Sequence, residues 1–388
     1  MAKKQASPRF GFVDSLRGLA ILGVIITHVG SKTLVSEYGA SDILRKVTGF
    51  GSLGVQLFYV VSAFTIMLLY TKRYKEESRY ILSFYVRRLM RIAPIYWGGI
   101  ILYTAVYGFL GSRGWQNSPE AWHYPIHILF LNMTNPFTPS SVVPGGWSIS
   151  NEVMFYLIFP LLFLLVKNLK QSIIFYLCCV LASPLFELVA NQLLQTVYSS
   201  ALEAQREQFS YRWLPNQLSC FAAGFVLYFL FSSKIKTIIR LSGNKVPEVS
   251  YIFSLMVLLI FSFYLARTQI LMMNHIFSAW FVFLAIGMYV FEWRLLVNPI
   301  LEYIGKISFS CYIFHFAIIN LVVSYSPFTS EVENFVVVFC VTTFLTVIIS
   351  SISYVYYESF FMSLTKKIVN KIQNNKKSTN TDLVKDEG

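Results

Sequence analysis

The chain has 388 residues, of which 55% are hydrophobic and only 13% are charged. Soluble domains carry about 25% charged residues, so this chain has too few charges to cover a water-facing surface of its size. Its aromatic content of 17% excludes a disordered chain. The composition is that of a polytopic membrane protein.

The net charge is +13, from 32 basic and 19 acidic residues. In a membrane protein such an excess reflects Lys and Arg in cytoplasmic loops more often than nucleic-acid binding. The five cysteines all lie in apolar runs without C-x-x-C spacing, which argues against a disulfide framework and a zinc site. We therefore expect neither a nucleic-acid partner nor a metal.

The hydrophobic segments predict an all-α fold of about ten transmembrane helices. A bilayer core of roughly 30 Å needs about 20 mostly apolar residues per helix. Ten segments qualify: 12–30, 53–71, 94–111, 147–166, 171–190, 213–232, 249–266, 275–291, 305–324 and 335–357. The apolar run 126–133 is too short to span, and we expect it to be re-entrant or interfacial.

Loop charges predict the orientation. With the N-terminus inside, the cytoplasmic segments carry 24 basic residues and the outward segments carry 7. Both termini are therefore predicted to be cytoplasmic. The expected regions are an N-terminal tail (1–11), a transmembrane domain (12–361) and a Lys-rich tail (362–388) that is disordered or lies along the inner leaflet.

Ionisable side chains at bilayer depth are expensive and mark candidate functional sites. Asp14, Arg17 and His28 fall on one face of the first span. For Asp14 and Arg17, a structural ion pair at the membrane entrance is the alternative to a functional role. His315, in the ninth span, is equally compatible with helix packing and with catalysis.

A polar stripe opens the fourth span, where Ser148, Glu152 and Tyr156 recur every four residues on one helix face. On the cytoplasmic side, the segment 79–94 alternates aromatic residues with arginines and suits an interfacial helix. Its Arg87, Arg88 and Arg91 could bind anionic lipid headgroups or a phosphate-bearing ligand.

These motifs, in this order, resemble those of acyltransferase family 3, the integral-membrane O-acyltransferases that modify bacterial surface glycans. The matching segments are FVDSLRGLA (12–20) followed by His28, GVQLFYVVSAF (54–64), RRLMRIAPIYW (87–97), WSISNEVMFY (147–156), SFSCYIFH (308–315) and Tyr357-Glu358. Ala63 and Ser359 stand where the family commonly has Gly and Pro. The chain resembles the stand-alone form, which lacks a fused extracytoplasmic esterase-like domain.

The resemblance implies transfer of an acyl group, in the first place acetyl, from a cytoplasmic acyl-CoA to a hydroxyl of a surface or lipid-linked polysaccharide. The enzyme would lie in the bacterial cytoplasmic membrane, among membrane lipids, and could hand the acyl group to a separate partner protein. Coenzyme A would dock at Arg87, Arg88 and Arg91, and no metal is required. The oligomeric state is left open.

The residues suggest roles for such a reaction. His28 can take the proton of the attacking hydroxyl, and Glu152 can orient its imidazole, because both are predicted at the same depth near the outer surface. Arg17 can steady the donor, and Tyr156 or Ser148 can offset charge on the thioester oxygen. The alternatives are a transporter that uses the buried His, Glu and Arg as a relay and clamp, and a non-catalytic sensor.

Overall fold

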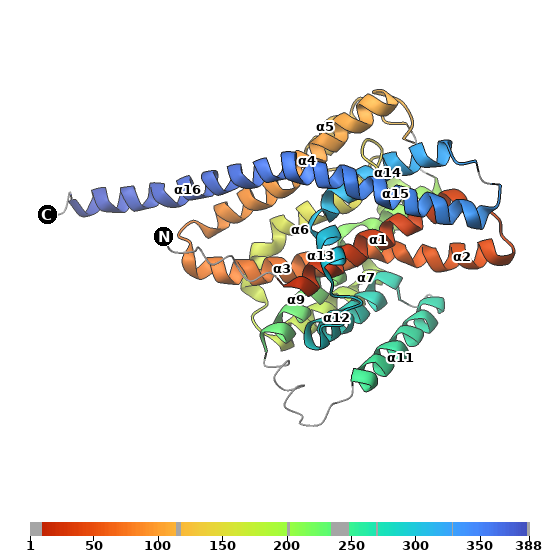
Figure 1. The fold of residues 1–388 in the computed structure, drawn as a ribbon. Coiled ribbons are helices and arrows are strands. Elements are labelled where there is room, and N and C mark those ends of the chain that lie inside the picture. Colours follow the sequence, from red (N-terminus) through yellow and green to blue (C-terminus); the bar gives the residue numbers. More distant parts are fainter. Residues whose placement is uncertain are drawn as a thin grey trace.

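The computed structural model describes residues 10–113, 118–199, 202–233, 248–268, 271–327 and 329–385, with side chains as far as residue 374. These residues form a bundle of helices (Figure 1). Nine helical stretches in these ranges are long and apolar enough to cross a bilayer, and a bent pair makes a tenth. The prediction of an all-α polytopic membrane fold is confirmed. Residues 1–9 of the expected N-terminal tail and the basic loop 234–245 lie outside the described residues.

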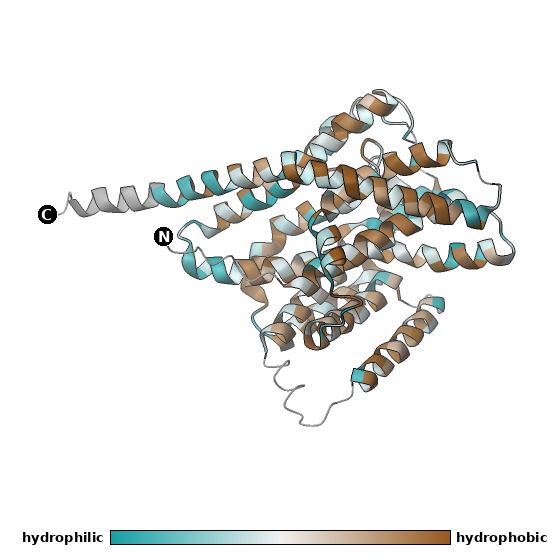
Figure 2. Ribbon diagram, in the orientation of Figure 1, coloured by the Kyte–Doolittle hydropathy of each residue, from teal (hydrophilic) through white to brown (hydrophobic). Residues whose placement is uncertain are grey.

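The spanning helices correspond one by one to the ten predicted segments. In chain order they are α1 (Gly11–Thr33), α3 (Gly54–Glu76), α4 (Tyr80–Tyr107), α6 (Gly146–Leu165), α7 (Leu169–Val197), α9 (Leu214–Ser232), α11 (Glu248–Arg267), α12 (Met273–Phe291), the pair α13 (Pro299–Lys306) and α14 (Ser308–Ser324), and α15 (Glu331–Ser353). Shorter elements are α2 (Gly39–Gly49), η1 (Phe50–Leu53), α5 (His123–Ile128), α8 (Glu203–Arg212), the π-helix η2 (Tyr354–Glu358) and α16 (Ser359–Lys385), which follows it. Apolar residues occupy the middle of the bundle and polar residues its two ends (Figure 2).

Helix α1 is the centre of the bundle, where it packs against α3, α13, α14 and α15. Two glycines let α13 approach it closely. A Cβ at Gly18 would meet the backbone carbonyl of Leu301, and a Cβ at Gly305 would meet the backbone of Asp14. Small residues at such crossings are how helices pack in a membrane, where van der Waals contact drives association. This contact places the first half of α1, with Arg17, beside the start of α14.

Two predicted segments have a different form in the structure. Residues 80–94 are not a separate interfacial helix but the first half of α4, which continues through Pro94 into the third span. The proline leaves the Met90 carbonyl without its usual N–H partner, a loss that membrane helices tolerate. Next to it, the Tyr357 hydroxyl donates to the Pro94 carbonyl at 3.1 Å and joins the π-turn to α4. The ninth span is broken at Ile307, where α13 and α14 meet at 78°.

The segment between α4 and α6 folds back into the bundle and carries the short apolar run 126–133. The Arg113 guanidinium donates to the carbonyls of Gly108 and Gly111 and to the Tyr124 hydroxyl. His127 is fully buried between the Tyr96 hydroxyl and the Thr138 carbonyl, each 2.8 Å away. Burial lowers the pKa of His127 to about 3, so the ring stays neutral and acts as a structural anchor.

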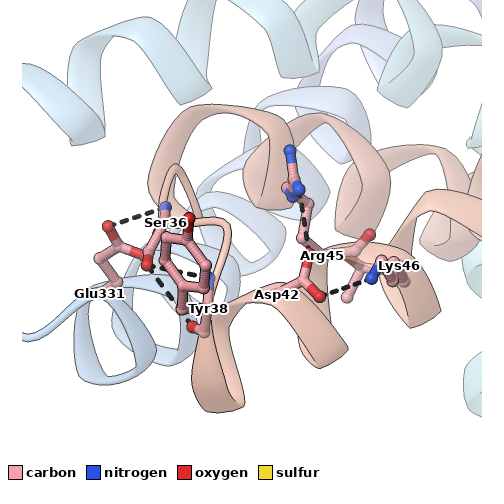
Figure 3. Close-up of polar contacts among 7 residues, drawn as sticks. Ser36, Tyr38, Asp42, Arg45, Lys46 and Glu331 are labelled. Carbon is pink, nitrogen blue, oxygen red and sulfur yellow. Dashed lines mark hydrogen bonds and ion pairs between the residues drawn. The ribbon is translucent and has the colours of Figure 1, made fainter.

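At the opposite end of the bundle from α16, the loop between α1 and α2 is bonded to the start of α15. The Glu331 carboxylate at the start of α15 accepts the Ser36 N–H at 3.1 Å, and Asp42 of α2 pairs with Arg45 and Lys46 (Figure 3). Exposed ion pairs of this kind contribute little, whereas the Ser36 contact joins segments 295 residues apart. It ties the loop between α1 and α2 to α15.

The C-terminal segment, where the sequence predicts a disordered tail, is helical as far as Lys385. Helix α16 follows α15 without a break other than the π-turn and lies along the first turns of α4 (Figure 1). The Gln373 side chain accepts from the Ser78 N–H and donates to the Ser83 hydroxyl. These contacts, together with the absence of Pro and Gly from 359–385, explain why the helix persists.

The predicted orientation can be tested with reporters. A reporter fused to the C-terminus should be active in the cytoplasm, and one inserted near Ser326, between α14 and α15, should be active outside. Alkaline phosphatase and fluorescent-protein fusions measure the two states. A cytoplasmic signal at Ser326 would refute the predicted orientation, and the inner and outer ends of the bundle would be exchanged.

The close crossing of α1 and α13 predicts a stability effect. Gly305→Ala should destabilise the protein by about 1–3 kcal/mol, because the added Cβ overlaps the α1 backbone, which cannot move aside. Thermal unfolding in detergent measures the loss. The matched control is Gly98→Ala in α4, where a Cβ meets only the Tyr357 hydroxyl at 3.9 Å, and equal losses in both variants would refute the packing argument.

Candidate active site

A central cavity of about 110 Å³ brings together residues of α1, α3, α4, α6 and α14. Its polar walls are Arg17, Ser62, Arg88, Arg91, Ser148, Glu152, Tyr156, Ser308 and Tyr312. Six of these were singled out from the sequence as catalytic or donor-binding residues: Arg17, Arg88, Arg91, Ser148, Glu152 and Tyr156. The helices that carry them are distant in sequence, so their convergence is a property of the fold.

Glu152 is held by two hydroxyl groups in this cavity. The Ser62 hydroxyl of α3 donates to its Oε1 at 2.5 Å, and the Tyr156 hydroxyl, one turn further along α6, donates to the same oxygen at 2.6 Å. Bonds to a carboxylate are the strong class of hydrogen bond. Tyr156, a member of the predicted polar stripe, thus holds the Glu152 carboxylate in place, because its hydroxyl proton is hydrogen-bonded to that carboxylate.

Three guanidinium groups share the cavity with this one carboxylate. Arg88 lies over the rings of Phe84 and Tyr156, at 5.8 and 5.6 Å. Arg17 pairs with Asp14 at 3.2 Å and donates to the Thr65 hydroxyl at 3.0 Å. With one Glu and three Arg in its walls, the cavity has an excess of positive charge suited to an anionic or electron-rich ligand.

A larger cavity of about 600 Å³ adjoins the central one, and Arg17, Arg88 and Arg91 line both. We call it the cytoplasmic cavity, after the side of the membrane that the loop charges predict for it. Four further cations line it: Lys72, Arg73, Arg87 and Lys306. Asp14 is the acidic side chain in its described wall. This is the strongest concentration of positive charge in a described cavity.

The three arginines predicted to bind the donor are not equivalent. Arg87 forms a bidentate pair with Glu77, at 2.5 and 2.9 Å, so its charge is already compensated. Arg91 lies 3.8 Å from Glu358, and Arg88 makes ring contacts. Arg88 therefore has its charge available to both cavities, and the charge of Arg91 is compensated only in part by the longer contact with Glu358, whereas Arg87 lines only the larger of the two cavities.

His28 lies in a third cavity of about 440 Å³, which we call the outer cavity after the side of the membrane that the loop charges predict for it. Its ring is 4.5 Å from that of Phe316 and 5.4 Å from that of His315, measured between centroids. The His315 ring is fully buried, with Nδ1 3.1 Å from the Cys311 carbonyl. The two candidate histidines, 287 positions apart in sequence, are therefore neighbours.

His28 and Glu152, which the sequence predicts to form a pair, do not line the same cavity. The two side chains line separate cavities, whose walls share Val55 and Tyr312. Equal depth in the membrane gives one coordinate only, and residues on different helices can share it while facing different spaces. At this boundary the Ser148 hydroxyl donates to the Tyr312 hydroxyl at 2.8 Å, and Tyr312 donates to the Gly145 carbonyl at 3.1 Å.

Several site residues were not identified from the sequence. Ser62 and Thr65 are uncharged and one turn apart on α3, and only their position in the second-span motif could have suggested them. Arg212 and Gln56 line the outer cavity. Arg212 stacks on Trp147 at 5.5 Å. Its charge, next to the end of a predicted span, is the feature by which the sequence could have identified it. Among the described residues, no three His, Cys, Asp or Glu side chains gather as metal ligands.

Three cavities in a membrane bundle, lined by paired and stacked ionisable groups, are the features of a membrane enzyme, and comparison with known proteins gives its class. The family model described as an acyltransferase domain, of acyltransferase family 3, matches residues 10–355. The chain belongs to this family, and its long apolar helices are those of a multi-pass membrane protein. The match to an acyltransferase domain favours an enzyme over the transporter and sensor alternatives.

Curated relatives are similar over different parts of the chain. "Putative O-acetyltransferase SACOL0978" of Staphylococcus aureus (strain COL) is 27% identical over 92% of this chain and 58% of the relative. O-acetyltransferase OatA of S. aureus is 28% identical over 44% of this chain and 28% of its own length. Acyltransferase MdmB of Streptomyces mycarofaciens is 26% identical over 42% of each protein.

The chain thus spans less than two thirds of the length of these relatives. No solved structure matches it.

Because His28 lines the outer cavity and Glu152 lines the central cavity beside it, we predict that acyl transfer needs both side chains. His28→Ala and Glu152→Gln should each lower acyl transfer by at least a hundredfold, the range in which general acid–base groups contribute. Transfer of labelled acyl groups by protein in proteoliposomes measures this. Glu187→Gln, an exposed glutamate of α7, is the matched control, and wild-type turnover in His28→Ala would exclude the histidine as base.

Proposed function

We propose that the protein transfers an acetyl group from acetyl-CoA, bound from the cytoplasm, to a hydroxyl of a cell-envelope glycan presented at the outer face of the cytoplasmic membrane. The observation that carries this proposal is the series of three cavities, in which each shares residues with the next. Arg17, Arg88 and Arg91 join the cytoplasmic to the central cavity, and Val55 and Tyr312 join the central to the outer one.

The cytoplasmic cavity suits the donor. Coenzyme A is a polyanion, and guanidinium groups match phosphate oxygens in bidentate geometry. Apolar side chains such as Phe64 and Leu68 alternate with the cations in the wall, which suits an uncharged pantetheine arm. The small central cavity beyond favours a short acyl group at its end.

The outer cavity suits a polyhydroxylated acceptor. Its walls include Gln56, Ser140, Trp147, Gln208 and Tyr211, a mixture of hydrogen-bonding groups and one indole. The Gln56 side chain is 2% exposed and donates to Gln217 at 3.0 Å, while its Oε1 has no hydrogen-bond partner among the described residues. That oxygen can accept a bond from a sugar hydroxyl.

The chemistry is then an attack across the boundary between these two cavities. The acceptor hydroxyl oxygen bonds to the thioester carbonyl carbon while His28 takes its proton, and the carbon–sulfur bond breaks to release the thiolate, which is then protonated. His315, adjacent to His28, acts as a positioning residue. Guanidinium groups of the central cavity offset charge on the carbonyl oxygen, and Glu152, fixed by Ser62 and Tyr156, organises them. Because each cavity shares wall residues with the next, we infer direct transfer from acetyl-CoA to the acceptor.

The proposal is tested by donor binding and turnover in sealed proteoliposomes. Arg88→Ala and Arg91→Ala should each weaken acetyl-CoA binding by about 10- to 100-fold, the 1.5–3 kcal/mol of a charged hydrogen bond, and should reduce its salt dependence. Arg87→Ala, whose charge is compensated by Glu77, is the control and should lose less. Isothermal titration at two salt concentrations measures both.

Turnover should acetylate an outward-facing saccharide while coenzyme A is released on the donor side. Mass spectrometry of the glycan identifies the product. If acetyl-CoA binds normally to the Arg88 and Arg91 variants while membrane retention falls, these arginines bind lipid headgroups and the donor assignment is wrong.

A further inference from the structure

The central cavity has two different ends. It shares Arg17, Arg88 and Arg91 with the cytoplasmic cavity. It shares Val55 and Tyr312 with the outer cavity. Among the residues that the structure describes, none lines both the cytoplasmic and the outer cavity. A ligand that enters among the arginines therefore reaches Val55 and Tyr312 last.

One face of α14 follows the path from the central to the outer cavity. Ser308 lines the central cavity, Phe316 lines the outer one, and Tyr312, midway between them in sequence, lines both. Side chains four residues apart lie on the same face of a helix, and the distance from Ser308 to Phe316 is about 12 Å along its axis. Tyr312 is thus the side chain of α14 that lies at the boundary, and it is much larger than Val55, which it faces there across the two cavities.

The Tyr312 side chain is held in place at this boundary. Its hydroxyl donates to the Gly145 carbonyl at 3.1 Å and accepts from the Ser148 hydroxyl at 2.8 Å. Its ring packs edge-on against that of Phe58, with the centroids 6.4 Å apart, and the residue is 6% exposed. Gly145 has a φ of 74°, and a Cβ there would meet the Tyr312 hydroxyl oxygen at 2.8 Å. A side chain bonded and packed in this way forms a rigid wall.

We propose that Tyr312 limits the length of the acyl group that the enzyme accepts, an inference that rests on the proposed function. The carbonyl carbon of an acetyl group is one bond from its methyl end. With the methyl group against the Tyr312 ring, the thioester carbonyl lies at the boundary, within reach of an acceptor hydroxyl in the outer cavity. A longer acyl chain would collide with the ring or leave the carbonyl nearer to the arginines and away from the acceptor.

A small side chain at position 312 would connect the two cavities. The central cavity has about 110 Å³ and the outer one about 440 Å³, so the space gained lies at the acyl end of the donor. A tyrosine that serves only helix packing would behave differently. Its loss would lower the amount of folded protein and leave the relative affinity for short and long acyl groups unchanged.

The test is isothermal titration of the full chain in nanodiscs with acetyl-CoA and with butyryl-CoA, without an acceptor. Wild type should bind butyryl-CoA at least about tenfold more weakly, since one methylene in a pocket changes affinity by about 10- to 200-fold. Tyr312→Ala should abolish most of this difference, because the longer chain can then extend into the outer cavity. Tyr312→Phe, which keeps the ring, should retain the preference of the wild type.

The ratio of two affinities measured on one variant does not depend on the fraction of protein that is folded. If Tyr312→Ala does not accumulate in the membrane, Tyr312→Leu, which also removes the ring, is measured in its place. Tyr325→Ala is the matched control, because Tyr325 lies just beyond the end of α14 and is 80% exposed. It should leave both affinities unchanged.

Two results would overturn the proposal: equal binding of acetyl-CoA and butyryl-CoA by the wild type, or an unchanged ratio in the variants that lack the ring. Failure of the wild type to bind either acyl-CoA would instead count against the proposed function.

Discussion

The hydrogen-bonded carboxylate of Glu152 is the interaction on which the rest of the site depends. A charge inside a membrane bundle is tolerated only when neighbouring groups replace its lost hydration. Ser62 and Tyr156 do so through one oxygen, and the three guanidinium groups supply opposite charge. Satisfying Glu152 therefore requires α3, α4 and α6 to meet around α1, and this meeting is what creates the central cavity.

The same requirement explains how the cations are distributed. Arg17 and Arg87 have acidic partners in Asp14 and Glu77, so part of the positive charge is fixed in the structure. Arg88 is supported by aromatic rings instead, a contact that keeps its charge while restricting its movement. A site that must attract a polyanion and release its product benefits from this mixture of compensated and available charge.

Much of this arrangement could be predicted from the sequence, because charge within a hydrophobic span is rare and conspicuous. Arg17 and Glu152 were found in this way, Tyr156 from its place in the polar stripe with Glu152, and Arg88 from the cluster of arginines before the third span. The ten spans followed from length and hydropathy. Ser62 could not be found by the same reasoning, since a serine in a span carries no charge. The contact of His28 with His315 was also missed, because depth along a helix says nothing of which neighbour the helix faces.

The π-turn at Tyr354–Glu358 has a consequence for the whole C-terminal arm. The buried positions of α15 include Thr342, Thr346 and Ser350. In a regular α-helix Tyr357, seven residues after Ser350, would face inward as they do. The wider turn places Glu358 there instead, where the Ser310 hydroxyl donates to it at 2.6 Å and Arg91 lies 3.8 Å away. The π-turn thus acts as a phase shift of one residue. If the π-turn were wound as a regular α-helix with all its residues kept, all of α16 would rotate by about 100°, which would take both Glu358 from Arg91 and Gln373 from the start of α4.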